Sequence, residues 1–297
     1  MNRMPIPARA DEESNLAVFR SLSGDLAARD AQDLMAYPFF SLAKSKRTVP
    51  IDFRTRDIFV RVEGTHEHGI ATIWDADVLI WAASQIVEAR DQGLPTSRLM
   101  AATPYEILRF VGRGTGNQHY DRLKAALDRL QSTTVATSIR QARGRRLHRF
   151  SWINEWKERA DETGRPDGIS LVLPDWFYAS LLDSSLILTL DPIYFTLTGG
   201  IERWLYRLVR KHAGRQPAGW HFEFAHLYSK SGSAMRASDF ARYLRRIAHS
   251  QSLPGYLLHV ERDRNGREVL AFRLRARPPI ERSIRELAQQ LKFGEKL

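Results

Sequence analysis

The sequence predicts an α+β fold in which one order of elements, helix, turn, helix and β-hairpin, occurs twice. The first occurrence lies within residues 104–152 and the second within residues 223–275. Hydrophobic residues make up 43% of the chain and charged residues 27%, which is typical of a globular protein with a buried core. A helix-turn-helix followed by a β-hairpin is the order of a winged helix, so we predict two tandem winged-helix domains.

The length of 297 residues fits about two domains. We expect a mobile N-terminal arm over residues 1–32, a first winged-helix domain over 33–160, a second over 161–277 and a C-terminal tail over 278–297. The boundary between the two domains follows from residues 161–168, a hydrophilic stretch rich in Gly, Asp, Glu and Pro. Such a composition is typical of a linker or an exposed loop.

The first domain is predicted to contain a small sheet, a long helix and then the winged-helix pattern. Strands are expected over Ile51–Phe53 and Ile58–Val62, and Asp75 can cap a helix that Gly93 ends after Gln92. The pattern itself is helix Tyr105–Val111, turn Gly112–Gly116, helix Asn117–Leu130, strand Thr133–Arg140, turn Gln141–Arg146 and strand Leu147–Trp152.

The second domain is predicted to follow the same plan with different residues. Asn265-Gly266 between two β-rich runs is the strongest short hairpin signal in the chain. The expected elements are strand Ile169–Leu173, an amphipathic helix Gly199–Ala213, helices Glu223–Tyr228 and Ala237–His249, and strands Tyr256–Arg262 and Arg267–Arg275.

The charge of the chain indicates a polyanionic partner. The formal net charge is +11, and 37 of the 45 basic residues are Arg. Arginine suits bidentate contacts to phosphate and guanine. A GC-rich genome would also favour Arg codons, so the placement of these residues decides between the two explanations.

The helix predicted over Ala237–His249 has one apolar and one basic face. Phe240, Leu244 and Ile247 form the apolar stripe at helical spacing. A solvated charged face is the ordinary explanation for the other side, but such faces usually mix signs, and Asp239 is the one acid here. The candidate DNA contacts of this domain, including the preceding turn and the following hairpin, are Lys230, Arg236, Ser238, Arg242, Tyr243, Arg245, Arg246, Arg262, Arg264 and Arg267.

The first domain offers a similar set. Asn and Gln can pair bidentately with adenine and Arg with guanine, and a hairpin rich in Arg can reach the minor groove. The candidate DNA contacts are Arg113, Asn117, Gln118, His119, Arg122, Lys124, Arg143, Arg145 and Arg146. Two basic hairpins, each directly after a helix with a basic outer face, favour double-stranded DNA as the partner.

Other classes of protein fit the sequence poorly. The chain has no Cys, which excludes disulfides and thiolate chemistry, and no apolar run approaches the length of a membrane helix, so a cytoplasmic protein without a membrane contact is expected. His66-Glu67-His68 is better explained as an exposed turn than as a metal site or nickase motif. The Gly-rich segment Gly112–Gly116 lacks the Lys of a phosphate-binding loop. We therefore expect neither enzymatic activity nor a metal or cofactor.

Several sequence blocks resemble the replication initiator protein A family, the RepA-type plasmid replication initiators. They span roughly residues 33–275, nearly the whole of the chain expected to be ordered. The blocks are Tyr37–Leu42, Gly69–Asp75, Pro104–Leu108, Leu173–Tyr178, Tyr194–Gly200, Glu202–Tyr206 and Leu253–Tyr256.

This resemblance implies a tandem winged-helix protein that binds repeated sites, called iterons, at a plasmid origin. It also implies help in opening the duplex, recruitment of the host initiator and replicative helicase, and repression of its own promoter as a dimer. No catalytic residue is implied. Two alternatives stay open: a winged-helix transcriptional repressor without an initiation role, and a nicking or priming enzyme whose motifs the sequence lacks. We expect self-association through the strands of the first domain, although those strands could equally complete a sheet within one chain.

Overall fold

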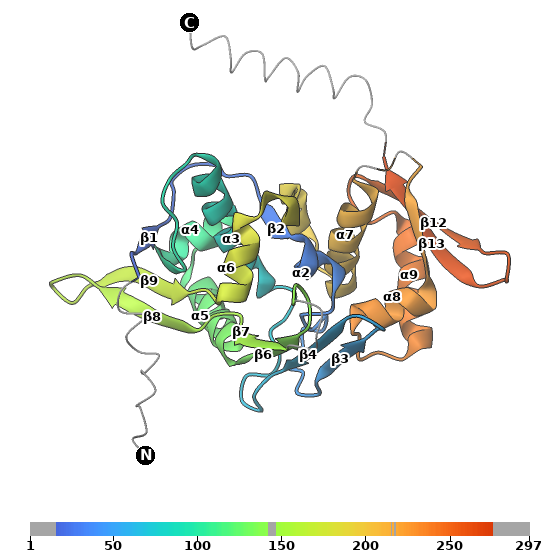
Figure 1. The fold of residues 1–297 in the computed structure, drawn as a ribbon, viewed down its shortest axis with the longest axis horizontal. Helices are drawn as coiled ribbons and strands as arrows, with labels where there is room; N and C mark the ends of the chain where they lie inside the picture. The colour runs from blue at the N-terminus through green and yellow to red at the C-terminus, as the bar shows by residue number, and fades with distance from the viewer. Residues whose placement is uncertain (1–15, 142–146, 215, 217, 276–297) are drawn as a thin grey trace, which may run out of the picture.

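The structure is a computed structural model, and it describes residues 16–141, 147–214, 216 and 218–275. It is a mixed α+β fold in which residues up to about 182 and residues from about 199 form two units side by side along the long axis (Figure 1). The C-terminal tail, residues 1–15 of the expected N-terminal arm and three hairpin residues of the candidate site, Arg143, Arg145 and Arg146, lie outside the described residues. Residues 16–32, which were expected to belong to a mobile arm, instead contain two short strands that pair with strands elsewhere in the fold.

Six α-helices of the described residues agree closely with those predicted from the sequence. The helices are α2 (Gln32–Ala36), α3 (Ala76–Asp91), α4 (Pro104–Phe110), α5 (Asn117–Ser132), α6 (Asp175–Leu182), α7 (Gly200–Ala213), α8 (Phe224–Ser231) and α9 (Ala237–Ser250), with short 3-10 turns η1 (Ser184–Leu186) and η2 (Pro192–Thr196). Of these, α2 and α6 were not predicted.

The strands form several small sheets. They are β1 (Phe19–Arg20), β2 (Arg29–Ala31), β3 (Ile51–Arg54), β4 (Phe59–Glu63), β5 (Leu99–Ala102), β6 (Thr134–Thr137), β7 (His148–Ser151), β8 (Glu155–Ala160), β9 (Pro166–Val172), β10 (Ile187–Thr189), β11 (Trp220–Glu223), β12 (Tyr256–Arg262) and β13 (Glu268–Leu274).

In the first unit, the predicted small sheet and the predicted hairpin belong to one sheet. Its strand order is β3-β4-β6-β7, because β4 pairs with β6 in the register Val60 to Thr137. Helix α4 begins with a capping box: the Thr103 hydroxyl accepts from the Glu106 amide, and the Glu106 carboxylate accepts from the Thr103 amide. This cap fixes where α4 starts, directly after strand β5.

The expected linker over residues 161–168 is instead the turn of a hairpin. Strands β8 and β9 pair on either side of it, and β9 also pairs with β5 within the sheet β1-β5-β9-β8. Trp176 and Leu181, which follow β9, share the core of the first unit with helix α3. The chain therefore leaves the first unit near residue 183, and the hydrophilic stretch marks an exposed turn, seen at the left of Figure 1.

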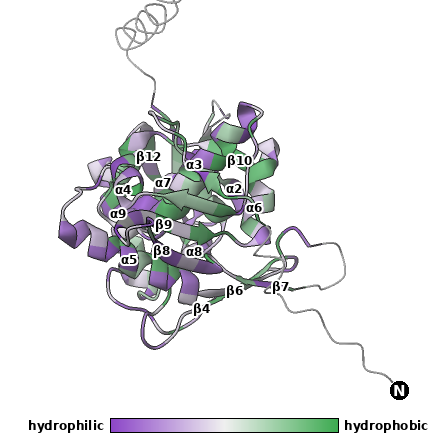
Figure 2. Cartoon of the chain, turned by 90° about the vertical axis from the view of Figure 1, so that its left-hand side faces the viewer, coloured by the Kyte–Doolittle hydropathy of each residue, from purple (hydrophilic) through white to green (hydrophobic). Residues whose placement is uncertain are grey.

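The second unit packs three helices against a small sheet of order β11-β13-β12. Strands β12 and β13 form the predicted hairpin and project to the right in Figure 1. Buried hydrophobic residues of the second unit form one core cluster. Figure 2 colours the cartoon by hydropathy, and many hydrophilic positions lie on the outer helices and loops of the chain. Within the described residues, no helix is long and apolar enough to span a bilayer.

Helix α7 ties the two units together through buried ion pairs. Arg203 Nη1 lies 2.7 Å from Asp77 Oδ1 on α3, and Arg207 Nε lies 2.7 Å from Asp30 Oδ2 in β2. All four side chains are almost fully buried. Burial raises the pKa of Asp30, and the charge of Arg207 opposes that shift. Because each buried charge needs its partner, these pairs hold α7 in one position against the first unit.

Candidate nucleic-acid interface

Helix α9 presents an amphipathic surface as predicted. Phe240, Leu244 and Ile247 are buried beneath it in the core of the second unit. Five side chains on its solvent side or at its N-terminus are exposed: Arg236, Ser238, Arg242, Arg245 and Arg246. The helix ends at Gln251, whose left-handed backbone (φ 51°) turns the chain into the hairpin. The local sequence thus places a row of Arg side chains beside a β-hairpin.

Intramolecular contacts position three of these Arg side chains. Arg245 makes a bidentate contact with Glu268 on β13, with N–O distances of 2.9 and 2.6 Å. The hydrogen bond from Arg245 lowers the pKa of Glu268. Arg246 lies on the other flank, with its guanidinium carbon 4.1 Å from the centroid of the Tyr243 ring. Arg242, between these flanks, is 79% exposed and contacts Asp239.

The β12–β13 hairpin carries three more of the candidate residues, Arg262, Arg264 and Arg267. Arg262 donates to the Gly266 carbonyl oxygen, and Arg267 pairs with Asp263 at 3.0 Å and with Glu223 at 3.1 Å. Arg264, at the turn, is exposed and makes no ion pair within the described part of the chain. Among the three candidate residues of the hairpin, Arg264 is therefore the one whose side chain no ion pair or hydrogen bond with a described residue restrains.

Lys230 is a correction to the candidate set. Its ammonium group donates to the Ala36 carbonyl oxygen at 2.9 Å and lies 4.9 Å from the centroid of the Tyr37 ring. Burial lowers the pKa of Lys230 to about 8. The side chain is thus directed into the contact between the two units, and long-range packing that no local pattern reveals takes it away from the outer surface.

The turn between α8 and α9 packs tightly against the first unit. Arg47 donates to the Gly232 carbonyl oxygen at 2.5 Å. Gly232 has a left-handed backbone (φ 58°), and a Cβ atom there would lie 2.7 Å from Pro38 Cβ and 2.8 Å from Ile51 Cγ2. Only glycine fits this position without displacing its neighbours. The orientation of α9 is therefore coupled to the first unit.

Helix α5 is less basic than α9. Asn117, Gln118 and Arg122 are exposed, but exposed Asp121 lies among them. Lys124 forms an ion pair with Glu158 of β8. Lys124 is therefore partly neutralised by the β8–β9 hairpin, whose place beside α5 the sequence did not predict.

Two further candidate residues, Arg113 and His119, make contacts within the protein. Arg113 lies 2.8 Å from Asp77, in the cluster that also holds Arg203, so its charge is partly engaged in the core. The His119 ring lies against Gly114, where a Cβ atom would come within 2.8 Å of its Nε2. This contact orients the ring toward the turn before α5.

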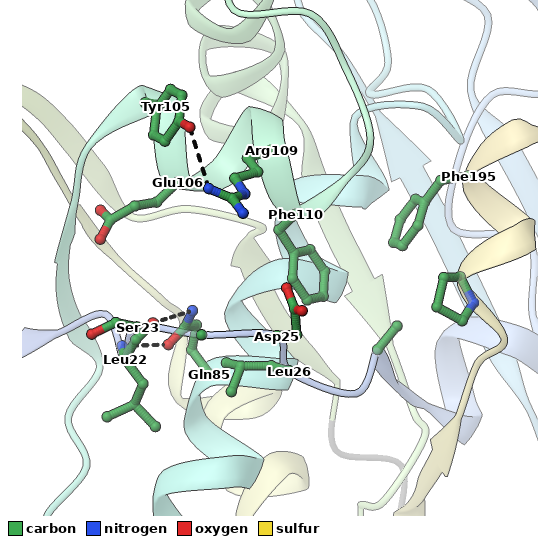
Figure 3. Close-up of a pocket in the computed structure, with 13 residues that line it drawn as sticks. Leu22, Ser23, Asp25, Leu26, Gln85, Tyr105, Glu106, Arg109, Phe110 and Phe195 are labelled. Atoms are coloured by element: carbon green, nitrogen blue, oxygen red, sulfur yellow. Dashed lines mark hydrogen bonds between the residues drawn. The ribbon is translucent and has the colours of Figure 1, made fainter. Parts of the chain in front are cut away.

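A separate pocket opens between residues 22–28, helix α4 and η2 (Figure 3). Gln85 accepts from the Leu22 amide at its base, and the Arg109 guanidinium contacts the Tyr105 hydroxyl at its rim (Figure 3). Asp25 and Glu106 outnumber the one basic residue in its lining. The pocket therefore has no electrostatic match to a polyanion.

Metal ligands do not gather anywhere in the described parts of the chain. Within them, no group of three or more His, Asp or Glu side chains could hold a metal ion. His68 lies beside Glu67 at 3.8 Å in a turn closed by a bridge between Thr65 and Gly69. This geometry is that of the exposed turn expected from the sequence.

The fold is similar to two crystal structures of RctB that contain its domains 2 and 3, with TM-scores of 0.57 and 0.52 at 14% and 15% identity. These matches cover 83% and 82% of this chain and 99% and 96% of those chains. A candidate replication protein of Wigglesworthia glossinidia brevipalpis is 28% identical over 226 residues, which are 75% of this chain and 81% of that protein.

The family follows from a match to a family model over most of the chain. The sequence model described as "Replication initiator protein A" matches residues 29–258. The chain belongs to this family, and its role lies in the initiation of replication. Members are typically DNA-binding proteins without enzymatic activity. The resemblance stated from the sequence blocks is thereby confirmed.

Proposed function

We propose that this protein is a plasmid replication initiator that binds repeated double-stranded DNA sites at an origin. The observation that carries the proposal is the exposed Arg row of α9 beside the β12–β13 hairpin. A basic helix of this kind can enter the major groove while the hairpin follows the backbone or the minor groove. We further propose that origin opening and recruitment of the host initiator and helicase follow from this binding.

The two units correspond, in this proposal, to two winged-helix domains. The first would consist of α4, α5 and the β6–β7 hairpin, and the second of α8, α9 and the β12–β13 hairpin. The similarity to consecutive domains 2 and 3 of RctB over most of both chains supports a two-domain organisation. The boundary that fits the sheet pairing lies near residue 183 instead of 160.

Self-association belongs to the same proposal. Strand β3 lies at the edge of the sheet β3-β4-β6-β7, with Ile51 and Phe53 buried and Asp52 and Arg54 exposed. Its backbone edge could pair with a second chain, as proposed for a dimer that represses its own promoter. Sedimentation of the whole chain over a range of concentrations tests this: a single monomeric species at all concentrations would argue against it.

Binding is tested with the full chain and a duplex that contains candidate origin repeats. The affinity should fall about a thousandfold or more between 50 and 200 mM salt if some 6–10 phosphates are contacted. A shuffled duplex of equal length is the control for base preference. A nearly flat salt dependence on both duplexes would refute DNA binding, and failure to maintain an origin plasmid despite specific binding would favour a repressor.

A further inference from the structure

A groove runs between the two units beside α9. We call it the inter-unit groove, and it is lined by Ser41–Val49, Trp74, Thr198–Glu202, Ser233–Met235, Tyr243 and Arg246. One wall belongs to the first unit, and the opposite wall belongs to the α8–α9 turn and α9 itself. Because the α8–α9 turn is clamped to the first unit, the two walls keep a fixed separation.

The lining of the inter-unit groove is strongly basic. It contains Lys44, Lys46, Arg47 and Arg246 against a single carboxylate, that of Glu202. Arg47 already donates hydrogen bonds to the carbonyl oxygens of Val49, Pro50 and Gly232. Three cations on the two walls therefore remain to face a ligand, and a ligand with regularly spaced negative charges fits them best.

Aromatic rings hold two of these cations over the groove. The Lys44 ammonium lies 5.6 Å from the centroid of the Trp74 ring, and Arg246 lies over Tyr243. The third cation, Lys46, is exposed and donates to the Glu67 carbonyl oxygen at 3.3 Å. Cation–π contacts of this kind restrict long side chains, so less side-chain entropy is lost when they bind an anion.

The position of the groove relative to α9 identifies which part of a duplex it would meet. Arg245 marks the flank of α9 that faces the sheet of the hairpin, through its contact with Glu268. Tyr243 and Arg246 mark the opposite flank, which faces the groove. A helix in the major groove has a phosphate backbone on each side. The hairpin can meet one backbone, and the inter-unit groove lies where the other would pass.

We propose that the inter-unit groove binds the phosphate backbone on the side of α9 opposite the hairpin, through Lys44, Lys46 and Arg246. This inference rests on the proposed function. Through Lys44 and Lys46, the first unit would contact the same DNA site whose bases α9 contacts. Both residues lie outside the helix-turn-helix of the first unit. The contact carries no base preference, since it involves phosphates alone.

The test compares Lys44→Ala/Lys46→Ala with the matched control Lys157→Ala/Arg165→Ala in the full chain. Both variants remove two exposed basic side chains, but the control residues do not line the groove. Affinity is measured by fluorescence anisotropy over a salt series, for a repeat duplex, a shuffled duplex and a single-stranded oligonucleotide. The slope of log affinity against log salt should decrease by about 2 in the groove variant, roughly 0.9 per lost contact, on both duplexes. The control should keep the wild-type slope.

The outcomes separate this inference from the proposed function. A steep slope for the wild-type chain that is equally steep in the groove variant would overturn the groove and leave DNA binding intact. A selective loss of single-strand binding would also overturn it, in favour of a groove for unpaired bases stacked on Trp74 and Tyr243. A flat slope for the wild-type chain would refute DNA binding itself and this inference with it.

Discussion

Replacing Asp30 by Asn should destabilise the whole chain, because it leaves Arg207 buried without a counter-charge. The two groups form a bidentate contact with N–O distances of 2.7 and 3.0 Å, and Arg207 is 1% exposed. At about 3 Å and an effective dielectric of about 20, the attraction amounts to roughly 5 kcal/mol. Breaking a buried pair from one side typically costs about 3–5 kcal/mol. The total free energy of unfolding is on the order of 5–15 kcal/mol, so this loss should be large.

Urea denaturation of the wild-type chain and the Asp30→Asn variant measures the effect. Asp52→Asn is the control, since Asp52 pairs with Arg61 on the surface, and it should change the midpoint little. The double variant Asp30→Leu/Arg207→Leu should recover much of the loss, because it removes the uncompensated charge. An Asp30→Asn variant that unfolds at the wild-type midpoint would show that the pair does not hold α7 in place.

Three further predictions address the interface and the packing behind it. Arg242→Ala should cost about 1–3 kcal/mol of binding and relax preference at particular base pairs, whereas Arg264→Ala should weaken binding to all sequences alike; unchanged base preference for the first variant would remove α9 from base recognition. Gly232→Ala should lower the urea midpoint more than Gly266→Ala, because both glycines have a positive φ but only Gly232 lacks space for a Cβ atom. Equal losses of stability would contradict the tight packing of the α8–α9 turn against the first unit. Burial lowers the pKa of His212 to about 4, so between pH 4 and 6.5 the unfolded chain binds one proton more than the folded chain, and stability rises with pH. His212→Phe should flatten this rise, and an unchanged dependence of the urea midpoint on pH would show that His212 does not cause it.

The sequence predicted elements well where one periodic pattern decides them. Helix α9 differs from its predicted range by one residue, and β12 coincides with its predicted range, because an apolar stripe and an Asn-Gly turn are local signals. Strand β8 was missed because four of its six residues are charged and none is fully buried, so no alternation shows. Its formation depends on pairing with β9, and the sequence predicted a strand over Ile169–Leu173 there but not the hairpin that joins it to β8.

The candidate site could be predicted as a surface but not in its individual contacts. The exposed Arg residues of α9 follow from helical spacing. The burial of Lys230 against Ala36 and the pairing of Arg113 with Asp77 depend on residues 194 and 36 positions away. Lys44 and Lys46 stand in a segment without regular structure, so only the packing of two units against each other brings them beside α9.

The same long-range contacts predict that the second unit is not stable alone. A fragment of residues 161–297 would separate β9 from β5 and β8, and it would leave Arg203 and Arg207 without Asp77 and Asp30. The fragment would also lack Ala28, Met35 and Ile80, which share a hydrophobic core with α7, so the apolar side chains that they cover would be exposed to water. The fragment should therefore lack a cooperative urea transition, measured by Trp fluorescence. A fragment that unfolds cooperatively at the midpoint of the full chain would show that the second unit folds independently and that α7 does not depend on the first.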